Sequence, residues 1–375
     1  MKPEHAIIAD PVPFKGGHKN AAGKIIELLR DENIRITVLT CDPDSWQLPG
    51  VRRQRLLIPV WLLRQESGIG FYLQHLLIAF NILLVRILFG RIDKGIGISG
   101  PGVDMSLYLA QPLLRYRIVQ MIKGPVAASR SIGICLKRAD SIHYLHTMGA
   151  TLDAALATLD ECLSRDDLEH CSPMENGLLA SEWPTPCVYD TPRVFWAASL
   201  LRWKGLDHLI TALSTMPVEE RPAATICYIR PIDTSLDISS APVAIDGVDW
   251  HESPMDLDRL RAECNLFVST STNEPFGLSI LEAIAAGQCV LIPEDGAYWD
   301  QRLTDEINCV KYRPGDAEDL REKLHELKLS PRRIERIGTA AREIAEYYRA
   351  EKRYRGVLID ISAREMTRRV GSLAR

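Results

Sequence analysis

The segment Ser271–Gly287, STNEPFGLSILEAIAAG, decides the fold and marks a candidate ligand site. A buried strand precedes it, a loop carries Glu274, and a helix is expected to begin near Leu278, just after Gly277. Ligands of open α/β sheets bind at the carboxyl ends of strands. The free N–H groups and the positive dipole end of a first helical turn attract anions. The segment therefore predicts a diphosphate site with a carboxylate on each side, Glu274 in the loop and Glu282 in the helix.

The residues around this segment alternate between short apolar runs and amphipathic helical patterns. Such alternation predicts a doubly wound α/β domain with a parallel sheet. Strands are expected at 194–198, 223–229, 266–269 and 289–292, and helices at 205–213, 255–263 and 278–286.

The N-terminal half begins with the same alternation, which predicts a second domain of this kind. Strands are expected at 6–9, 35–39, 95–98 and 118–122, and helices at 18–30 and 103–114. A chain of 375 residues is also too long for one ordinary core. Three prolines interrupt residues 181–192, which we interpret as the linker. We expect domains at 1–185 and 190–345, followed by a helical tail at 346–375 that is long enough to pack back on the first domain.

The run from Glu274 to Gly287 resembles the glutamate, seven residues, glutamate motif of retaining glycosyltransferases of family 4. The resemblance implies the GT-B fold, with two Rossmann-like domains facing an interdomain cleft. It also implies that Glu274 contacts the donor sugar and that Glu282 binds the nucleotide ribose. The backbone amides that would hold the donor diphosphate are those of Phe276, Gly277 and Leu278, with Ser279 in the same turn.

A second segment, Ala198–Leu213 (ASLLRWKGLDHLITAL), resembles the phosphate-binding loop of the same family. Lys204 corresponds to the lysine that contacts the donor phosphate, and a lysine ammonium is a compact charge suited to that task. The family usually carries an arginine about five residues earlier, where this chain has Ser199. Arg202 in the same loop could supply that charge, or it could be an exposed cation without a role.

A third segment, PFKGGHKNA at 13–21, resembles the glycine loop that closes over the diphosphate from the N-terminal domain. Gly16 and Gly17 would permit a close approach, although a Gly-Gly pair is often only a turn. The chain departs from the family where many members have a histidine near the reacting centre. The nearest counterpart is Lys123, which we expect either to bind a sugar hydroxyl or phosphate, or to be a surface lysine.

No metal or other cofactor is expected beside the nucleoside diphosphate sugar. Asp42 and Asp44 form a D-x-D pattern, but their loop position is typical of a helix or turn cap. Nine scattered cysteines without a C-x-x-C pair predict free thiols in a reducing cytosol. The N-terminal residues lack the charged start and apolar run of a signal peptide.

The resemblance implies transfer of a sugar from a nucleoside diphosphate sugar, with retention of its configuration, to a glycan or lipid-linked acceptor. Envelope polysaccharide or lipopolysaccharide biosynthesis is the expected setting, by analogy. Two alternatives stay open. Ser199 and Lys123 depart from the family pattern, so a degenerate binding module is one alternative. The other is a nucleotide-sugar epimerase or sugar phosphorylase on the same fold.

The N-terminal half also has a basic block next to an apolar helix. Residues 52–138 contain thirteen Lys and Arg but only three acids. Residues 69–89 are apolar except for Gln74, His75, Asn81 and Arg86, so we expect a buried or surface-lying helix rather than a membrane span. Peripheral attachment to an anionic cytoplasmic membrane face is our hypothesis, while a solvated basic face and a core helix are the alternatives. We expect no nucleic-acid partner.

Overall fold

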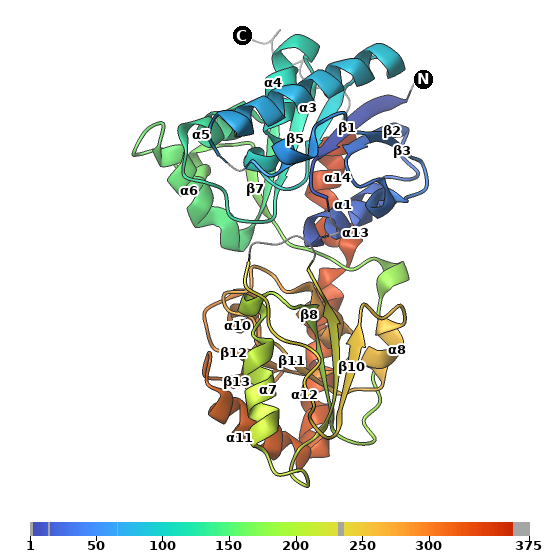
Figure 1. Ribbon diagram of the computed structural model, residues 1–375, viewed down its shortest axis with the longest axis vertical. Coiled ribbons are helices and arrows are strands. Elements are labelled where there is room, and N and C mark those ends of the chain that lie inside the picture. The colour runs from blue at the N-terminus through green and yellow to red at the C-terminus, as the bar shows by residue number, and fades with distance from the viewer. Residues whose placement is uncertain (1–2, 14–15, 66, 232–235, 363–375) are drawn as a thin grey trace. The chain divides into compact units, whose positions relative to one another are not determined.

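The computed structural model describes residues 3–13, 16–65, 67–231 and 236–362 (Figure 1). Within it the chain forms two compact units. The first contains the residues up to Gly177 and, of the described tail, Ala350–Ser362. The second is Leu178–Arg349.

The first unit is built on a parallel seven-stranded sheet in the order β3-β2-β1-β4-β5-β6-β7. Its strands are β1 Glu4–Asp10, β2 Ile34–Thr40, β3 Val51–Arg55, β4 Lys94–Gly97, β5 Arg117–Ile122, β6 Ser141–Leu145 and β7 Cys171–Met174. The order reverses between β1 and β4, so right-handed crossovers place helices on both faces of the sheet (Figure 1).

The helices of the first unit include two from the C-terminal end of the chain. They are α1 Gly17–Leu28, α2 Val60–Leu63, α3 Gly68–Phe89, α4 Pro101–Leu114, α5 Arg130–Arg138, α6 Gly149–Ala157, α13 Ala350–Arg353 and α14 Arg355–Ser362. Helix α4 packs on β1, β4 and β5, while α14 packs on β5 and β6 and α13 on α1. The described tail thus completes the core of the first unit.

The second unit has a parallel six-stranded sheet in the order β10-β9-β8-β11-β12-β13. Its strands are β8 Arg193–Ser199, β9 Ala223–Ile229, β10 Val248–Glu252, β11 Leu266–Val268, β12 Cys289–Pro293 and β13 Val310–Tyr312. Its helices are α7 Leu206–Thr215, α8 Leu257–Ala262, α9 Leu278–Ala285, α10 Tyr298–Arg302, α11 Ala317–Lys328 and α12 Pro331–Ala345.

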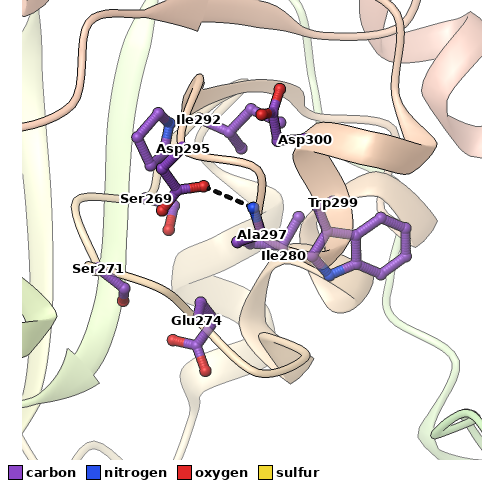
Figure 2. A pocket seen from close by; sticks show the side chains of 10 residues that line it. Ser269, Ser271, Glu274, Ile280, Ile292, Asp295, Ala297, Trp299 and Asp300 are labelled. Carbon is purple, nitrogen blue, oxygen red and sulfur yellow. Dashed lines mark hydrogen bonds between the residues drawn. The ribbon is translucent and has the colours of Figure 1, made fainter. Parts of the chain in front are cut away.

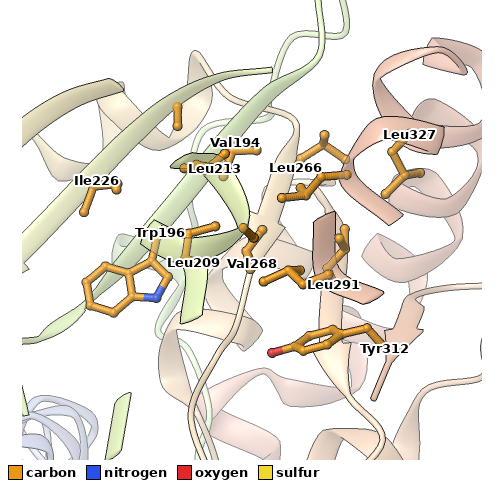
Figure 3. Packing of buried hydrophobic residues seen from close by; sticks show 14 of the residues in the cluster. Val194, Trp196, Leu209, Leu213, Ile226, Leu266, Val268, Leu291, Tyr312 and Leu327 are labelled. Carbon is orange, nitrogen blue, oxygen red and sulfur yellow. The ribbon is translucent and has the colours of Figure 1, made fainter. Parts of the chain in front are cut away.

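The core of the second unit lies between this sheet and its helices (Figure 3). Residues from the central strands, such as Val194, Ile226 and Leu291, pack against Leu209 of α7 and Leu327 of α11 and are completely buried. Parallel strands covered on both faces consist of continuous apolar residues. This is why the strands expected at 194–198, 223–229, 266–269 and 289–292 are confirmed.

The boundary between the units differs from the expected linker. The structure divides the chain at Gly177 and again at Arg349, whereas the sequence placed the first boundary at 181–192 and the second at 345. The proline-rich segment belongs to the second unit because its backbone bonds to that unit. The amide of Cys187 donates to the carbonyl of Ala286 (2.8 Å), and that of Val188 to Ala262 (3.1 Å). Proline prevents regular structure there but does not prevent packing.

Candidate functional site

The first part of the site is the loop that joins β8 to α7. It makes a 3-10 turn at Arg202–Lys204 and enters the helix through Gly205, which has a positive φ of 72°. A Cβ atom on Gly205 would lie 2.0 Å from the carbonyl oxygen of Thr270. Only glycine accommodates both this φ and this close approach. Gly205 therefore places Lys204 directly against the loop that follows β11.

The second part is that neighbouring loop, which carries Glu274. Two hydrogen bonds join the loops: the amide of Thr272 donates to the carbonyl of Trp203 (2.9 Å), and the side-chain hydroxyl of Thr270 donates to the carbonyl of Lys204 (2.9 Å). The Lys204 ammonium lies 2.5 Å from a carboxylate oxygen of Glu274, and both side chains are mostly buried. The structure thus brings together two residues that are 70 positions apart in the sequence.

The start of α9 forms the third part. Gly277 has a φ of 73°, and a Cβ atom there would lie 3.0 Å from Cγ of Glu274. Its carbonyl accepts hydrogen bonds from the next turn of the helix and from the indole of Trp299 (3.3 Å). The amides of Leu278 and Ser279 donate to no residue in the described part of the chain. Two free amides beside an ammonium group form an anion site.

These loops lie where the sheet reverses its strand order. β8 is the first strand of the second unit, and its neighbours β9 and β11 lie on opposite sides of it. In doubly wound sheets the crevice at the carboxyl ends of such strands is the usual ligand site. The Lys204 loop follows β8 and the Glu274 loop follows β11, so both loops line this crevice.

Phe276 anchors the Glu274 loop in a cluster of aromatic side chains. Its ring is 3% exposed and lies 4.8 Å from the ring of Tyr298, 5.5 Å from Trp299 and 6.1 Å from Tyr348, measured between centroids. The hydroxyls of Tyr298 and Tyr348 are hydrogen-bonded at 2.9 Å. Because the side chain points into this cluster, Phe276 can contribute to a ligand site only through its backbone. The sequence did not indicate the cluster, because its members come from three separate segments.

Glu282 lies one turn into α9 and is held by a buried arginine. Arg261 of α8 is 6% exposed, and its guanidinium lies 2.5 Å from Oε2 of Glu282 and 2.9 Å from the carboxylate of Asp258. Within the described residues, Oε1 of Glu282 has no hydrogen-bond partner, so it is available to a ligand hydroxyl. A carboxylate fixed by a bidentate-capable guanidinium is well oriented for such a bond. Arg261 was not among the predicted site residues, because its short helix, with charged residues on both sides of it in the sequence, resembles an exposed surface helix.

A small pocket opens beside Glu274 (Figure 2). Its far wall is the turn after β12, in which Asp295 accepts hydrogen bonds from the amides of Asn273 (3.1 Å) and Ala297 (3.0 Å). Asp295 thereby ties the Glu274 loop to the next strand of the sheet, and it too was missed. The pocket is lined by Ser269, Ser271, Glu274, Ile280, Ile292, Pro293, Asp295, Ala297, Trp299 and Asp300.

Two other predicted residues lie near the Lys204 loop without contacts that define a role. Arg202 is exposed, and its side chain pairs with no residue in the described ranges, while its amide donates to the carbonyl of Asp237 (2.8 Å). Ser199 is the last residue of β8. Both therefore remain candidates by position alone.

The remaining predicted residues belong to the first unit. Gly16 is extended and caps α1, and a Cβ atom on Gly17 would meet no atom within 4 Å, so the helix start is open. The Lys123 ammonium, just after β5, donates to the carbonyl of His18 at 3.4 Å. The glycine loop and Lys123 thus lie together within this unit. Burial lowers the pKa of Lys123 to about 7, although the charge of Asp104 opposes this shift.

A polar cluster surrounds them at the carboxyl ends of β1 and β4. Asp10 is fully buried and lies 3.1 Å from the Lys19 ammonium. Burial disfavours its charge, but His18 and Lys19 outweigh that effect and lower its pKa. Burial raises the pKa of Asp104 to about 6. Buried atoms of His18, Ser99 and Asp104 have no hydrogen-bond partner in the described ranges, so the cluster has unused bonding capacity for a polar ligand.

Asp42 caps the short 3-10 helix Pro43–Trp46, and its carboxylate pairs with Lys19 at 3.0 Å. The interpretation of the D-x-D pattern as a cap is confirmed for Asp42. Among the residues that the structure describes, no group of three or more His, Cys, Asp or Glu side chains is arranged to hold a metal ion.

Residues 187–344 match the family described as Glycosyl transferases group 1. No curated protein matches the chain.

Solved structures similar to this chain have the same two-unit fold. Anabaena Alr3699/HepE in complex with UDP-glucose has a TM-score of 0.72 and 15% identity, with 96% of this chain and 99% of that chain covered. The lipopolysaccharide outer core galactosyltransferase WaaB (TM-score 0.65, 14% identity, 96% and 99% covered) is also similar. So is WaaG, a glycosyltransferase involved in lipopolysaccharide biosynthesis (TM-score 0.65, 14% identity, 96% and 100% covered).

The chain therefore has the GT-B fold, and its residues 187–344 are similar to the family described as Glycosyl transferases group 1.

Proposed function

We propose that this protein is a retaining glycosyltransferase that moves a sugar from a nucleoside diphosphate sugar to a glycan or lipid-linked acceptor in envelope polysaccharide or lipopolysaccharide biosynthesis. The observation that carries the proposal is the position of Lys204 and Glu274 beside the free amides of Leu278 and Ser279. A cationic group and two N–H donors are arranged for a phosphate, and a carboxylate beside them is arranged for sugar hydroxyls.

The proposed roles follow from the contacts. The amides at the start of α9 and Lys204 stabilise the charge that develops on the leaving diphosphate. Arg261 holds Glu282 so that its second oxygen accepts a hydrogen bond from a ribose hydroxyl. Glu274 orients the donor sugar, and Asp295 keeps its loop in place.

In the reaction the bond between C1 of the sugar and the diphosphate oxygen breaks, and a bond from C1 to the acceptor oxygen forms on the same face. The acceptor hydroxyl passes its proton to the leaving phosphate oxygen. This step needs no protein nucleophile, so the role of Glu274 is to orient the sugar. It requires no metal or other cofactor.

The similarity to HepE, whose structure contains UDP-glucose, supports a uridine diphosphate sugar as the first donor to test. The similarity to WaaB and WaaG supports an envelope glycan as the acceptor class.

The test is calorimetric titration of the full chain with UDP, GDP, ADP and their hexose derivatives. We expect saturable binding of one nucleotide family and about tenfold or greater weakening by Glu282→Ala, since a hydrogen bond to a charged group contributes about 1.5–3 kcal/mol. Glu335→Ala, at an exposed position of α12, is the matched control and should bind normally.

Turnover of the bound donor then tests the chemistry, with the anomeric configuration of the product read by NMR. Absence of nucleotide binding by the folded protein would refute the donor site and favour a degenerate binding module. A product of inverted configuration would refute the retaining mechanism. Conversion of the donor without an acceptor, or only with free phosphate, would indicate an epimerase or a phosphorylase.

A further inference from the structure

Helix α3 of the first unit is apolar on its outer side as well as on its inner side, where Ile78, Ile82 and Val85 are buried together with three polar residues. Gln74, His75 and Asn81 are all 6% exposed or less. The side-chain amide of Asn81 bonds to both the amide and the carbonyl of Leu57, at 2.9 and 3.2 Å. A surface helix of a soluble protein normally has charged and polar residues on its outer side. Asn81 thus fixes the helix on its own unit.

The outer side of α3 is a continuous apolar stripe. Its members recur at helical spacing, so they lie on one side of the helix. Ile69 is 89% exposed and Phe80 is 55% exposed. The stripe consists of Ile69, Tyr72, Leu73, Leu76, Phe80, Ile87 and Leu88.

The two helices that contact α3 have exposed apolar side chains of their own. Val60 and Trp61 of α2 are 69% and 62% exposed, and Leu113 at the end of α4 is 72% exposed. We call the stripe together with these three residues the α3 face. Figure 1 shows α3 as a long helix on the outside of the first unit. Single exposed apolar residues are common in soluble proteins, but a contiguous patch of this kind marks an interaction site.

The charge around the α3 face is positive. From Arg52 to Asp93 the sequence has six arginines, no lysine and two acids, Glu66 and Asp93, the second of which pairs with Arg91 at 3.0 Å. Arg64 follows α2, Arg86 lies on α3, and both are exposed. The Arg52 guanidinium stacks 4.2 Å from the ring of Phe89, which places it next to the end of α3. Arginine beside apolar and aromatic side chains suits phosphate head groups above an acyl region.

We propose that the α3 face docks the protein onto the surface of an anionic lipid bilayer, with α3 lying in the plane of the membrane. Because the partner is a lipid surface, this inference does not depend on the chemistry of the donor site. Docking on a bilayer would bring the protein to the surface where a lipid-linked acceptor is held. Aromatic residues such as Trp61 and Tyr72 are typical of the membrane–water boundary.

A spanning orientation fits the structure less well. Helix α3 is long and apolar enough to cross a bilayer, with a mean hydropathy of 1.8 over its most apolar window, but 39% of that window is buried inside the protein. Crossing would pull Gln74, His75 and Asn81 into hydrocarbon and break the bonds of Asn81 to Leu57. Lying on the surface keeps these bonds and buries only the outer stripe.

Two other occupants of the α3 face are opposed by its charge. A second copy of the chain would bring two arginine-rich faces together. The C-terminal segment, residues 363–375, lies outside the described residues and contains four arginines and one acid, so it is basic as well. An anionic lipid surface is complementary to this charge.

The experiment is vesicle co-sedimentation of the full chain, comparing phosphatidylcholine vesicles with vesicles that also contain phosphatidylglycerol. We expect binding to the anionic vesicles that weakens with added salt. Phe80→Glu and Leu76→Glu should each lower the partition coefficient by about tenfold or more, because each buries a charge where an apolar side chain would insert. Leu329→Glu, at a 68% exposed position of the second unit, is the matched control and should bind normally.

The charge is tested separately with Arg64→Gln and Arg86→Gln. Each should lower the partition coefficient about fivefold, since an arginine near an anionic surface contributes about 1 kcal/mol. Nucleotide binding by the same preparations should be unchanged, so a failure here is distinguishable from a failure of the donor site.

Three results would overturn the inference. One is absence of binding to anionic vesicles, which is also the result expected if the chain's own tail covers the α3 face. A second is equal binding to neutral vesicles. The third is a dimer in lipid-free solution that Phe80→Glu dissociates, which would assign the α3 face to a second copy.

Discussion

The substitution Gly205→Ala should damage both the stability of the second unit and its donor site. A Cβ atom at this position would lie 2.0 Å from the backbone oxygen of Thr270, and the residue has a φ of 72°. Left-handed backbone costs an ordinary residue about 1–2 kcal/mol. Relieving an overlap in a packed region costs about 1–3 kcal/mol more. The free energy of unfolding should therefore fall by about 2–5 kcal/mol.

The effect on the donor site follows from how the overlap is relieved. The loops can separate only by lengthening the bonds from Thr270 to Lys204 and from Lys204 to Glu274. A displaced Lys204 no longer contributes to phosphate binding, which should weaken the affinity for a nucleoside diphosphate by about tenfold or more. Differential scanning calorimetry measures the stability, and isothermal titration with the preferred nucleotide measures the affinity.

Gly338→Ala is the matched control. A Cβ atom on Gly338 of α12 would lie 2.0 Å from the carbonyl oxygen of Gly287, so the overlap is equal but does not involve the Lys204 loop. We expect a smaller loss of stability, about 1–3 kcal/mol, because the helical backbone of Gly338 adds no left-handed strain, and normal nucleotide affinity. Wild-type stability and affinity in Gly205→Ala would refute the reasoning, as would an equal loss of affinity in both variants.

Three further predictions concern single side chains. Glu274→Gln should lower the rate of sugar transfer by about 10²-fold. The affinity for the diphosphate should stay equal or rise a few fold, because Lys204 no longer has a carboxylate that competes with the phosphate. Weaker diphosphate binding in calorimetry would contradict this. Phe276→Ala should lower the free energy of unfolding by about 3–4 kcal/mol, because a buried ring is lost; a loss below about 1 kcal/mol in chemical denaturation would show that the ring does not anchor the loop. Lys123 should titrate near pH 7 in the folded protein and near pH 10.5 in the unfolded protein. Between these two pH values the unfolded state binds more protons than the folded state, so the free energy of unfolding rises with pH from about 7 to 10.5. NMR of isotopically methylated lysines measures the pKa of Lys123 directly. Lys123→Met should remove the part of the pH dependence of stability that Lys123 causes. A measured pKa near 10 would show that Lys123 is not in a buried environment.

The sequence by itself determined the class of fold. Strands such as β8 and β11 are short apolar runs between amphipathic helices, and this local periodicity reflects burial on both faces of a parallel sheet. Two edge strands, β3 and β10, were missed for the same reason. β3 (VRRQR) and β10 (VDWHE) lie at the edges of their sheets and are largely polar, so no apolar run marks them.

The sequence also indicated part of the site, because those features are local. Glu274, Gly277 and Glu282 lie within nine positions, and the left-handed turn at Gly277 is set by the chain immediately around it. The pairing of Lys204 with Glu274 is not local and depends on β8 and β11 being neighbours in the sheet.

Only the tertiary structure decided which distant side chains support these residues. Arg261 contacts Glu282 from another helix, and Tyr348, near the C-terminal end of the second unit's sequence, contacts Phe276. It also decided that the polar residues of α3 face inward, since Asn81 finds its hydrogen bonds on the segment before α2. Periodicity describes each helix or strand by itself, whereas such contacts arise only when the order of the strands brings separate segments together.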